Sequence, residues 1–215
     1  MGAWFWVAQV LGVVTLTFAF ISYQRKEQRR YLFAMGISYF FWMLMFLAMG
    51  LDGDMTNFIA PTLVAGVGTI RAFVFWWILA KDSKRRKIGG RIFLLCFLAA
   101  AVAGGVVAIV NSSPEVQVFQ WVVMVTALLF TVGQYLPNKH FLRVAAVLYA
   151  IAFSFASTPL YILDGDFRWN PIGLLIEASK IISVVVFYII NIKKRTARDV
   201  LVAPNGDGLG TDDLT

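Results

Sequence analysis

The chain has 215 residues, of which 60% are apolar and 14% are charged, and its mean hydropathy is +0.75. This composition lies outside the range of soluble globular domains and indicates a membrane protein. Because a membrane-spanning helix needs roughly 20 apolar residues, seven such helices would use most of the chain and exclude a large soluble domain. The net charge of +7 does not indicate nucleic-acid binding, since most basic residues stand in short runs between apolar stretches.

Seven apolar stretches of spanning length follow one another along the chain. They cover residues 4–23, 31–50, 57–80, 91–110, 118–135, 142–162 and 171–192. Charged or turn-forming segments such as Asp52-Gly53-Asp54 separate them. The first stretch has no basic residue before it and no small-residue cleavage site after it, so we expect a retained helix rather than a signal peptide. The sequence therefore predicts an all-α, polytopic membrane protein with seven transmembrane helices.

The basic residues alternate from loop to loop. The loops after the first, third and fifth stretches and the segment after the seventh hold 16 of the 19 lysines and arginines, including Lys139 and Arg143. The other loops hold only Arg168, beside several acidic residues. Because cytoplasmic loops are enriched in Lys and Arg, we expect the N-terminus outside and the C-terminus in the cytoplasm.

The chain also carries signs of an internal duplication. The LDGD segment at residues 51–54 recurs at residues 163–166, a shift of 112 residues, and the same shift pairs Tyr23 with Tyr135. Helices one to three then repeat as helices five to seven, and the extra fourth helix gives both repeats the same orientation, as in transporters with parallel repeats.

This duplication predicts a 3+1+3 plan. The first repeat covers residues 1–81, and a basic cytoplasmic loop with linker helix four covers 82–115. The second repeat covers 116–194, and residues 195–215 are expected to form a disordered cytoplasmic tail. Helix four is rich in alanine and glycine around Gly104 and Gly105, so neighbouring helices can pack closely on it.

The beginning of the chain resembles a bacterial family. Trp-Val-Ala-Gln at residues 6–9, Gly12-Val13 and the basic turn at residues 25–31 are similar to the opening of the YgjV-type inner membrane proteins. Residues 68–71, Gly-Thr-Ile-Arg, resemble the small or amide residue followed by Ile-Arg in that family. The resemblance covers residues 4–80 well and implies the bacterial inner membrane. The 3+1+3 plan is similar to that of SWEET sugar facilitators and PnuC-type nicotinamide riboside transporters, which implies transport.

Three charged residues lie within the predicted spans: Arg71, Glu177 and Lys180. Inserting a charged side chain into the membrane at the centre of a helix costs about 2.5 to 3.5 kcal/mol, so we expect these residues to face protein or water and to have partners. Glu177 and Lys180 share one helix face. Arg71 aligns with Ser183 in the second repeat, which makes Ser183 a further candidate for the site. We expect the charges to converge on the bundle axis, with Arg71 and Glu177 as possible partners. They form either a midplane site for a small hydrophilic or anionic solute or a structural salt bridge.

Other polar residues within the spans are weaker candidates for lining a solute pathway. Tyr39 and Trp42 lie in the second helix and Ser154 in the sixth. A serine in the middle of a helix commonly bonds to its own helix, which gives Ser154 an alternative structural role.

No catalytic motif is present. The sequence lacks HExxH, GxSxG and a phosphate-binding loop, and it has one histidine and one cysteine. We therefore expect no enzymatic activity, no cofactor and no metal site. The expected partners are the lipid bilayer and a small-molecule solute, with no nucleic acid, and formation of a homo-oligomer stays open.

The leading hypothesis is a transporter or facilitator of a small polar solute, an anion included, that works by alternating access between two three-helix bundles. One alternative is a non-transport membrane protein in which the buried charges form a structural salt bridge with an assembly role. A further alternative is a retinal-binding photoreceptor that uses Lys180, because seven helices, an outside N-terminus and a mid-membrane lysine coincide.

Overall fold

The computed structural model describes residues 2–53, 55–79, 84–110, 114–136, 138–163 and 170–202. Side chains are described for these residues except 56–57, 60–61, 84–87, 115–116, 156–163, 170–174 and 194–202. All regular elements in these ranges are α-helices: α1 (Ala3–Gln24), α2 (Gln28–Asp52), α3 (Met55–Ile78), α4 (Lys84–Val110), α5 (Pro114–Tyr135), α6 (Lys139–Leu163) and α7 (Asn170–Val202). The all-α prediction is confirmed.

Among the described residues, five helices are long and apolar enough to cross a membrane. They are α1, α2 and the segments Ile88–Val110, Gln117–Tyr135 and Leu175–Lys193 of α4, α5 and α7, and α3 adds a shorter apolar stretch, Thr62–Ile78. The outward faces of the helices carry large exposed apolar side chains, including Val10, Leu95 and Val107. Helices satisfy their own backbone hydrogen bonds, so such surfaces suit a lipid environment. The chain is therefore a membrane protein, as its composition predicts.

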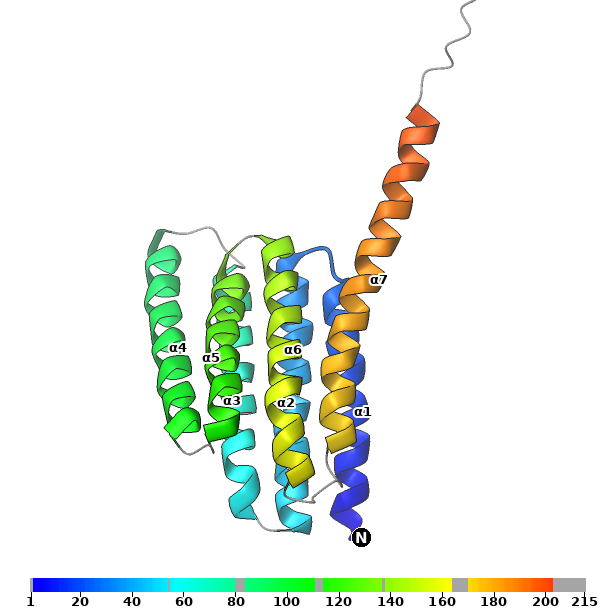
Figure 1. The fold of residues 1–215 in the computed structure, drawn as a ribbon. Helices are drawn as coiled ribbons and strands as arrows, with labels where there is room; N and C mark the ends of the chain where they lie inside the picture. Colours follow the sequence, from blue (N-terminus) through cyan, green and yellow to red (C-terminus); the bar gives the residue numbers. More distant parts are fainter. Residues whose placement is uncertain are drawn as a thin grey trace, which may run out of the picture.

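The helices form two layers with α4 at one edge (Figure 1). Consecutive helices run in opposite directions, so α1, α3, α5 and α7 run one way and α2, α4 and α6 the other. α1 packs on α2 and α7, α2 on α3, α5 on α4 and α6, and α6 on α7. α3 makes smaller contacts with α4 and α5. Six helices thus form a ring with an extensive α1–α7 junction and a loose α3–α5 junction, while α4 lies outside it.

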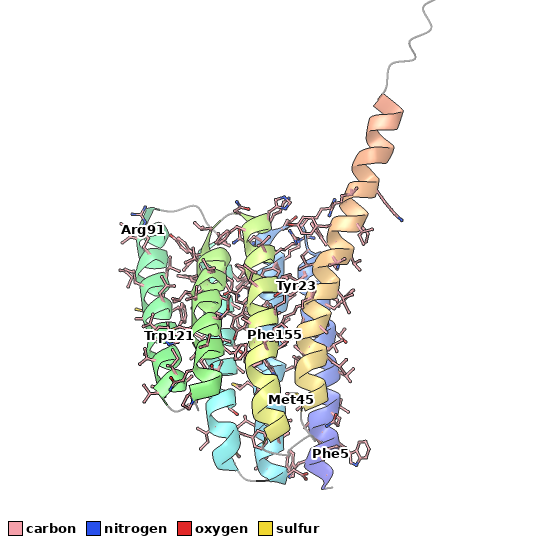
Figure 2. The ribbon with its side chains drawn as sticks, in the orientation of Figure 1. Phe5, Tyr23, Met45, Arg91, Trp121 and Phe155 are labelled. Carbon is pink, nitrogen blue, oxygen red and sulfur yellow. The ribbon has the colours of Figure 1, made fainter. Side chains whose placement is uncertain are left out.

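Exposed basic side chains gather at one end of the bundle. Arg91 lies near one end and Phe5 near the other (Figure 2). The turn between α1 and α2 and the turn between α5 and α6 lie at the Arg91 end. The exposed side chains of Arg25, Lys26 and Lys139 belong to those turns or the helix starts beside them. We call this the basic end of the bundle.

Local signals explain where two of the helices begin. Asn138 precedes α6, and its Oδ1 accepts hydrogen bonds from the backbone N–H groups of His140 at 3.1 Å and Phe141 at 3.0 Å. These bonds satisfy donors that have no partner inside the helix. Pro114 is the first residue of α5, a position where the missing N–H costs no helical bond.

The last helix is longer than the sequence predicts. α7 continues to Val202, so residues 195–202 of the expected disordered tail are helical, and Arg, Ala and Leu in this stretch are good helix formers. The rest of that tail, residues 203–215, and most of the second LDGD segment, residues 164–166, lie outside the described residues.

Candidate functional site

A cavity of about 380 Å³ lies between α3 and α5, and α4 covers it. Side chains from α2 and α6 complete its inner wall, including Tyr39 and Tyr149. The lining is mostly apolar and aromatic, and Arg71 is the one charged side chain among the described residues that line it. A concave apolar pocket with a few converging polar groups is typical of small-molecule sites.

Small residues of α4 and α3 make room for this cavity. Gly104 and Ala108 of α4 present little or no side chain to it. A Cβ atom at Gly105 would lie 2.5 Å from the Cγ of Met124, so glycine permits the close approach of α4 to α5. In α3, a Cβ atom at Gly68 would lie 3.1 Å from the Cδ1 of Tyr39. The small-residue surface predicted for helix four therefore forms one wall of the cavity.

Arg71 enters the cavity from α3 with few protein contacts. Its Nη1 donates a 2.7 Å hydrogen bond to Oγ1 of Thr131 on α5, and its Cζ lies 5.5 Å from the centre of the Phe130 ring. The hydroxyl of Thr131 in turn donates to the carbonyl of Ala127 at 2.8 Å. Within the described part of the chain, the buried Nε of Arg71 has no hydrogen-bond partner, and no carboxylate pairs with the guanidinium. The cation can therefore accept a ligand with negative charge.

Glu177 and Lys180 form a buried ion pair within α7. Their side chains are 1% and 4% exposed, and Nζ of Lys180 is bonded to Oε1 of Glu177. The expected contact between Arg71 and Glu177 is not made. Glu177 pairs instead with Lys180, which lies one helical turn away on the same face of α7. The second carboxylate oxygen of Glu177, Oε2, has no partner among the described groups.

Trp42 lies between the ion pair and the cavity. Its indole lines the cavity, and Nζ of Lys180 lies 5.3 Å from the indole centre, a cation–π distance. The ring of Tyr39 stacks on Trp42 with centroids 5.9 Å apart. Tyr149 also lines the cavity, and its ring stacks on Phe130 with centroids 5.7 Å apart. The three predicted charges therefore surround one aromatic layer, although they do not meet in one ion pair.

The two predicted serines do not line the cavity. Ser183 closes the α1–α7 junction: its Oγ donates to the carbonyl of Phe20 at 2.7 Å, and Nε2 of Gln24 donates to its Oγ at 2.8 Å and to its carbonyl at 2.7 Å. Ser154 donates to the carbonyl of Ala150 in its own helix at 2.8 Å. The structure therefore places Arg71, Tyr39 and Trp42 at the cavity and the serines elsewhere.

Arg143 has a role that the sequence analysis missed. It was expected in a basic cytoplasmic loop, but it lies in α6 and is only 2% exposed. Its guanidinium donates to the carbonyls of Tyr23 at 3.3 Å, Arg25 at 2.8 Å and Lys139 at 3.4 Å, and it lies 3.5 Å from the centre of the Phe187 ring. A count of charges per loop cannot distinguish a solvated arginine from one that satisfies the end of a helix.

Gln28 makes a similar contact from the other half of the chain. Its Nε2 lies at the start of α2 and donates to the carbonyls of Leu136 at 2.6 Å, Gln134 at 2.9 Å and Gly133 at 3.5 Å. The start of α2 thus caps the end of α5, as the start of α6 caps the end of α1 through Arg143. These two contacts tie the halves of the bundle together at its basic end.

Comparison with protein families, with curated proteins and with solved structures found no match to this chain. The functional assignment therefore depends on the cavity and on the charges around it.

Proposed function

We propose that this protein is a membrane transporter or facilitator for a small polar solute, and that the solute is an anion. The observation that carries the proposal is Arg71, a cation at the wall of a cavity of about 380 Å³ that makes one hydrogen bond to the described part of the chain. A charge within a membrane is costly, and such charges mark substrate pathways when protein groups do not satisfy them.

In this proposal all seven helices cross the bacterial inner membrane, with the N-terminus outside and the basic end in the cytoplasm. Five helices have the length and apolar composition of spans. The alternating directions of the helices bring the basic turns to one end (Figures 1 and 2), which is the distribution that the positive-inside rule describes. The proposed relationship to the YgjV-type family agrees with this location.

A parallel duplication of α1–α3 as α5–α7 is supported by matching contacts. At a shift of 112 residues, Arg71 of α3 corresponds to Ser183 of α7. Arg71 donates across the α3–α5 junction to Thr131, and Ser183 donates across the α1–α7 junction to the carbonyl of Phe20. Equivalent positions therefore bridge equivalent junctions. The four helices α1, α3, α5 and α7 also run in the same direction, as two parallel repeats require.

Alternating access would then consist of the two three-helix bundles rocking against each other. The loose α3–α5 junction holds the cavity and would open and close around the solute. At the basic end, Gln28 and Arg143 hold each bundle to the first helix of the other. Release of solute into the cytoplasm would require these two contacts to break or rearrange.

Purified protein in liposomes provides the test. A thermal-shift screen with small carboxylates, inorganic anions and neutral polyols selects a solute, and uptake of that solute is then measured. We expect an anion to raise the melting temperature and to be transported. Arg71→Gln should abolish both effects, and Arg91→Gln, which removes an exposed charge on α4, should preserve both. Transport by Arg71→Gln at the rate of the unsubstituted protein would contradict the proposal.

The structural alternative is favoured by one specific observation: Glu177 and Lys180 pair with each other within one helix, and neither of them lines the cavity. If the buried charges only stabilise the bundle, no solute will shift the melting temperature and no flux will be detected. A retinal-binding role is less consistent with the geometry, because Lys180 does not line the cavity and a chromophore bonded to Nζ would have to displace Trp42.

A further inference from the structure

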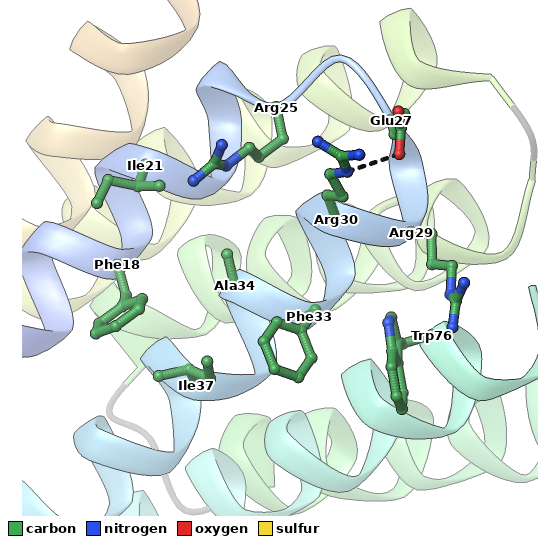
Figure 3. A pocket seen from close by; sticks show the side chains of 10 residues that line it. All are labelled: Phe18, Ile21, Arg25, Glu27, Arg29, Arg30, Phe33, Ala34, Ile37 and Trp76. Atoms are coloured by element: carbon green, nitrogen blue, oxygen red, sulfur yellow. Dashed lines mark ion pairs between the residues drawn. The ribbon is translucent and has the colours of Figure 1, made fainter. Parts of the chain in front are cut away.

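A second hollow of about 540 Å³ lies at the basic end of the bundle, between the end of α1, the beginning of α2 and α3 (Figure 3). We call it the basic groove. Its upper part is lined by Arg25, Glu27, Arg29 and Arg30. Its lower part is apolar and includes Phe18, Phe33 and Trp76. The basic groove shares none of its lining residues with the cavity at Arg71.

The upper part of the groove carries an excess of positive charge. Glu27 pairs with Arg30, with 2.8 Å between Oε2 and Nε, which leaves two of the three arginines without a carboxylate. Arg29 lies with its Cζ 5.2 Å from the centre of the Trp76 ring, and Figure 3 shows the Arg25 side chain on the opposite side of the groove from Arg29. Neither Arg25 nor Arg29 has an ion-pair partner among the described residues. Guanidinium groups bind phosphate oxygens well, because their planar N–H groups can form paired hydrogen bonds.

The lower part of the groove is suited to hydrocarbon. Phe33 is 44% exposed and faces outward from α2, and Phe18 and Trp76 extend this apolar surface onto α1 and α3. In a membrane protein, a row of arginines at the end of the helices lies at the level of the lipid headgroups, and the apolar residues one or two turns below lie at the level of the acyl chains. The upper, basic part of the groove therefore lies at the depth of a phospholipid headgroup, and the lower, apolar part lies at the depth of its acyl chains.

We infer that the basic groove binds an anionic phospholipid, with its phosphate between Arg25 and Arg29 and an acyl chain along Phe33 and Phe18. Charge complementarity favours a lipid with net negative charge over a zwitterionic lipid, whose ammonium group would meet the same arginines. The apolar lower part favours a lipid over a soluble phosphate, which would leave that surface uncovered. This inference does not depend on transport, because the groove is separate from the cavity.

Delipidated protein in detergent provides the test, with melting temperature and native mass spectrometry as readouts. The added probes are dioleoyl phosphatidylglycerol, dioleoyl phosphatidylcholine, glycerol phosphate and inorganic phosphate. We expect phosphatidylglycerol alone to raise the melting temperature and to give a one-lipid complex. The double substitution Arg25→Gln with Arg29→Gln should weaken this binding by about tenfold or more, since each basic residue near a membrane surface contributes measurably to anionic-lipid affinity. Both side chains are exposed, so the variant should still fold.

The matched control is Arg91→Gln with Lys139→Gln, which removes two exposed charges from the same end of the bundle outside the groove. It should bind phosphatidylglycerol as the unsubstituted protein does. Equal loss of lipid binding in both double variants would show that only the overall charge matters and would overturn the site. Equal stabilisation by glycerol phosphate or inorganic phosphate would show a soluble-anion site instead, and stabilisation by phosphatidylcholine to the same extent would remove the role of charge.

Discussion

Among the described residues, two arginines lie within the helix bundle, and their hydrogen-bond partners differ. At the basic end, Arg143 is buried, donates to the carbonyls of three residues and lies against the ring of Phe187. At the cavity, Arg71 donates one hydrogen bond, to Thr131, and its Nε has no partner among the described residues. Both carry the same charge in a low-dielectric environment. The difference indicates that Arg143 stabilises the fold through its hydrogen bonds, whereas the guanidinium of Arg71 is free to bind a ligand.

The junctions around these arginines follow the same division. The α1–α7 junction is closed by Ser183 and Gln24, neutral groups that satisfy each other at 2.7 to 2.8 Å. The α3–α5 junction has a charged residue, Arg71, and a cavity beside it. A neutral, mutually bonded contact stabilises a junction with little electrostatic cost, while an incompletely bonded charge makes a junction suitable for ligand binding.

Removing one member of the buried ion pair should have the largest effect on stability. Glu177→Gln leaves Lys180 charged and without a carboxylate in the interior, which should lower the free energy of unfolding by about 3 to 5 kcal/mol. Lys180→Met likewise leaves Glu177 charged and without its lysine partner in the interior. The double variant Glu177→Gln with Lys180→Met should recover much of the loss. Thermal unfolding in detergent measures this coupling, and additive losses in the double variant would show that the two side chains do not act as a pair.

Arg143→Gln should have the next largest effect. The substitution removes the charged hydrogen bonds to the end of α1 and the contact with Phe187, and we expect a loss of about 2 to 3 kcal/mol, since hydrogen bonds to charged groups contribute more than neutral ones. Hydrogen exchange should rise most at the end of α1 and the start of α6. Lys139→Gln, an exposed neighbour, is the control and should change little. If both substitutions lowered the free energy of unfolding equally, the loss would come from the change in net charge and not from the hydrogen bonds of Arg143.

Much of the fold follows from the sequence, because a helix in lipid satisfies its own backbone and long apolar stretches therefore become helices. The cavity is predictable only in part. Arg71 was identifiable as a charge in an apolar stretch, but its partner was not, because Thr131 contacts it through helix packing that no local pattern encodes. The burial of Arg143 was missed. The shift of 112 residues aligns Arg143 with Tyr31, which is also only 2% exposed, but the burial of Tyr31 is a feature of the structure and not of the sequence.

The α1–α7 contact should show a smaller effect. Ser183→Ala removes the bond to the carbonyl of Phe20 and one acceptor of Gln24, and Gln24 keeps its bond to the carbonyl of residue 183. We expect a loss of about 1 kcal/mol, typical of a neutral hydrogen bond. Solute-dependent stabilisation should be preserved, because neither Ser183 nor Gln24 lines the cavity. Loss of solute response at unchanged stability would show that the two junctions move together.

Arg71→Gln should change stability least and still be the most informative substitution. One hydrogen bond is lost, and the Nε was already without a partner among the described groups, so we expect the free energy of unfolding to change by less than about 1 kcal/mol. The matched variant Thr131→Val removes the same bond from the other side and keeps the charge. If the cation serves a solute, the anion-dependent rise in melting temperature disappears in Arg71→Gln and persists in Thr131→Val. If Arg71 is instead structural, Arg71→Gln will destabilise the protein as strongly as Arg143→Gln does, and the distinction between the two arginines will not hold.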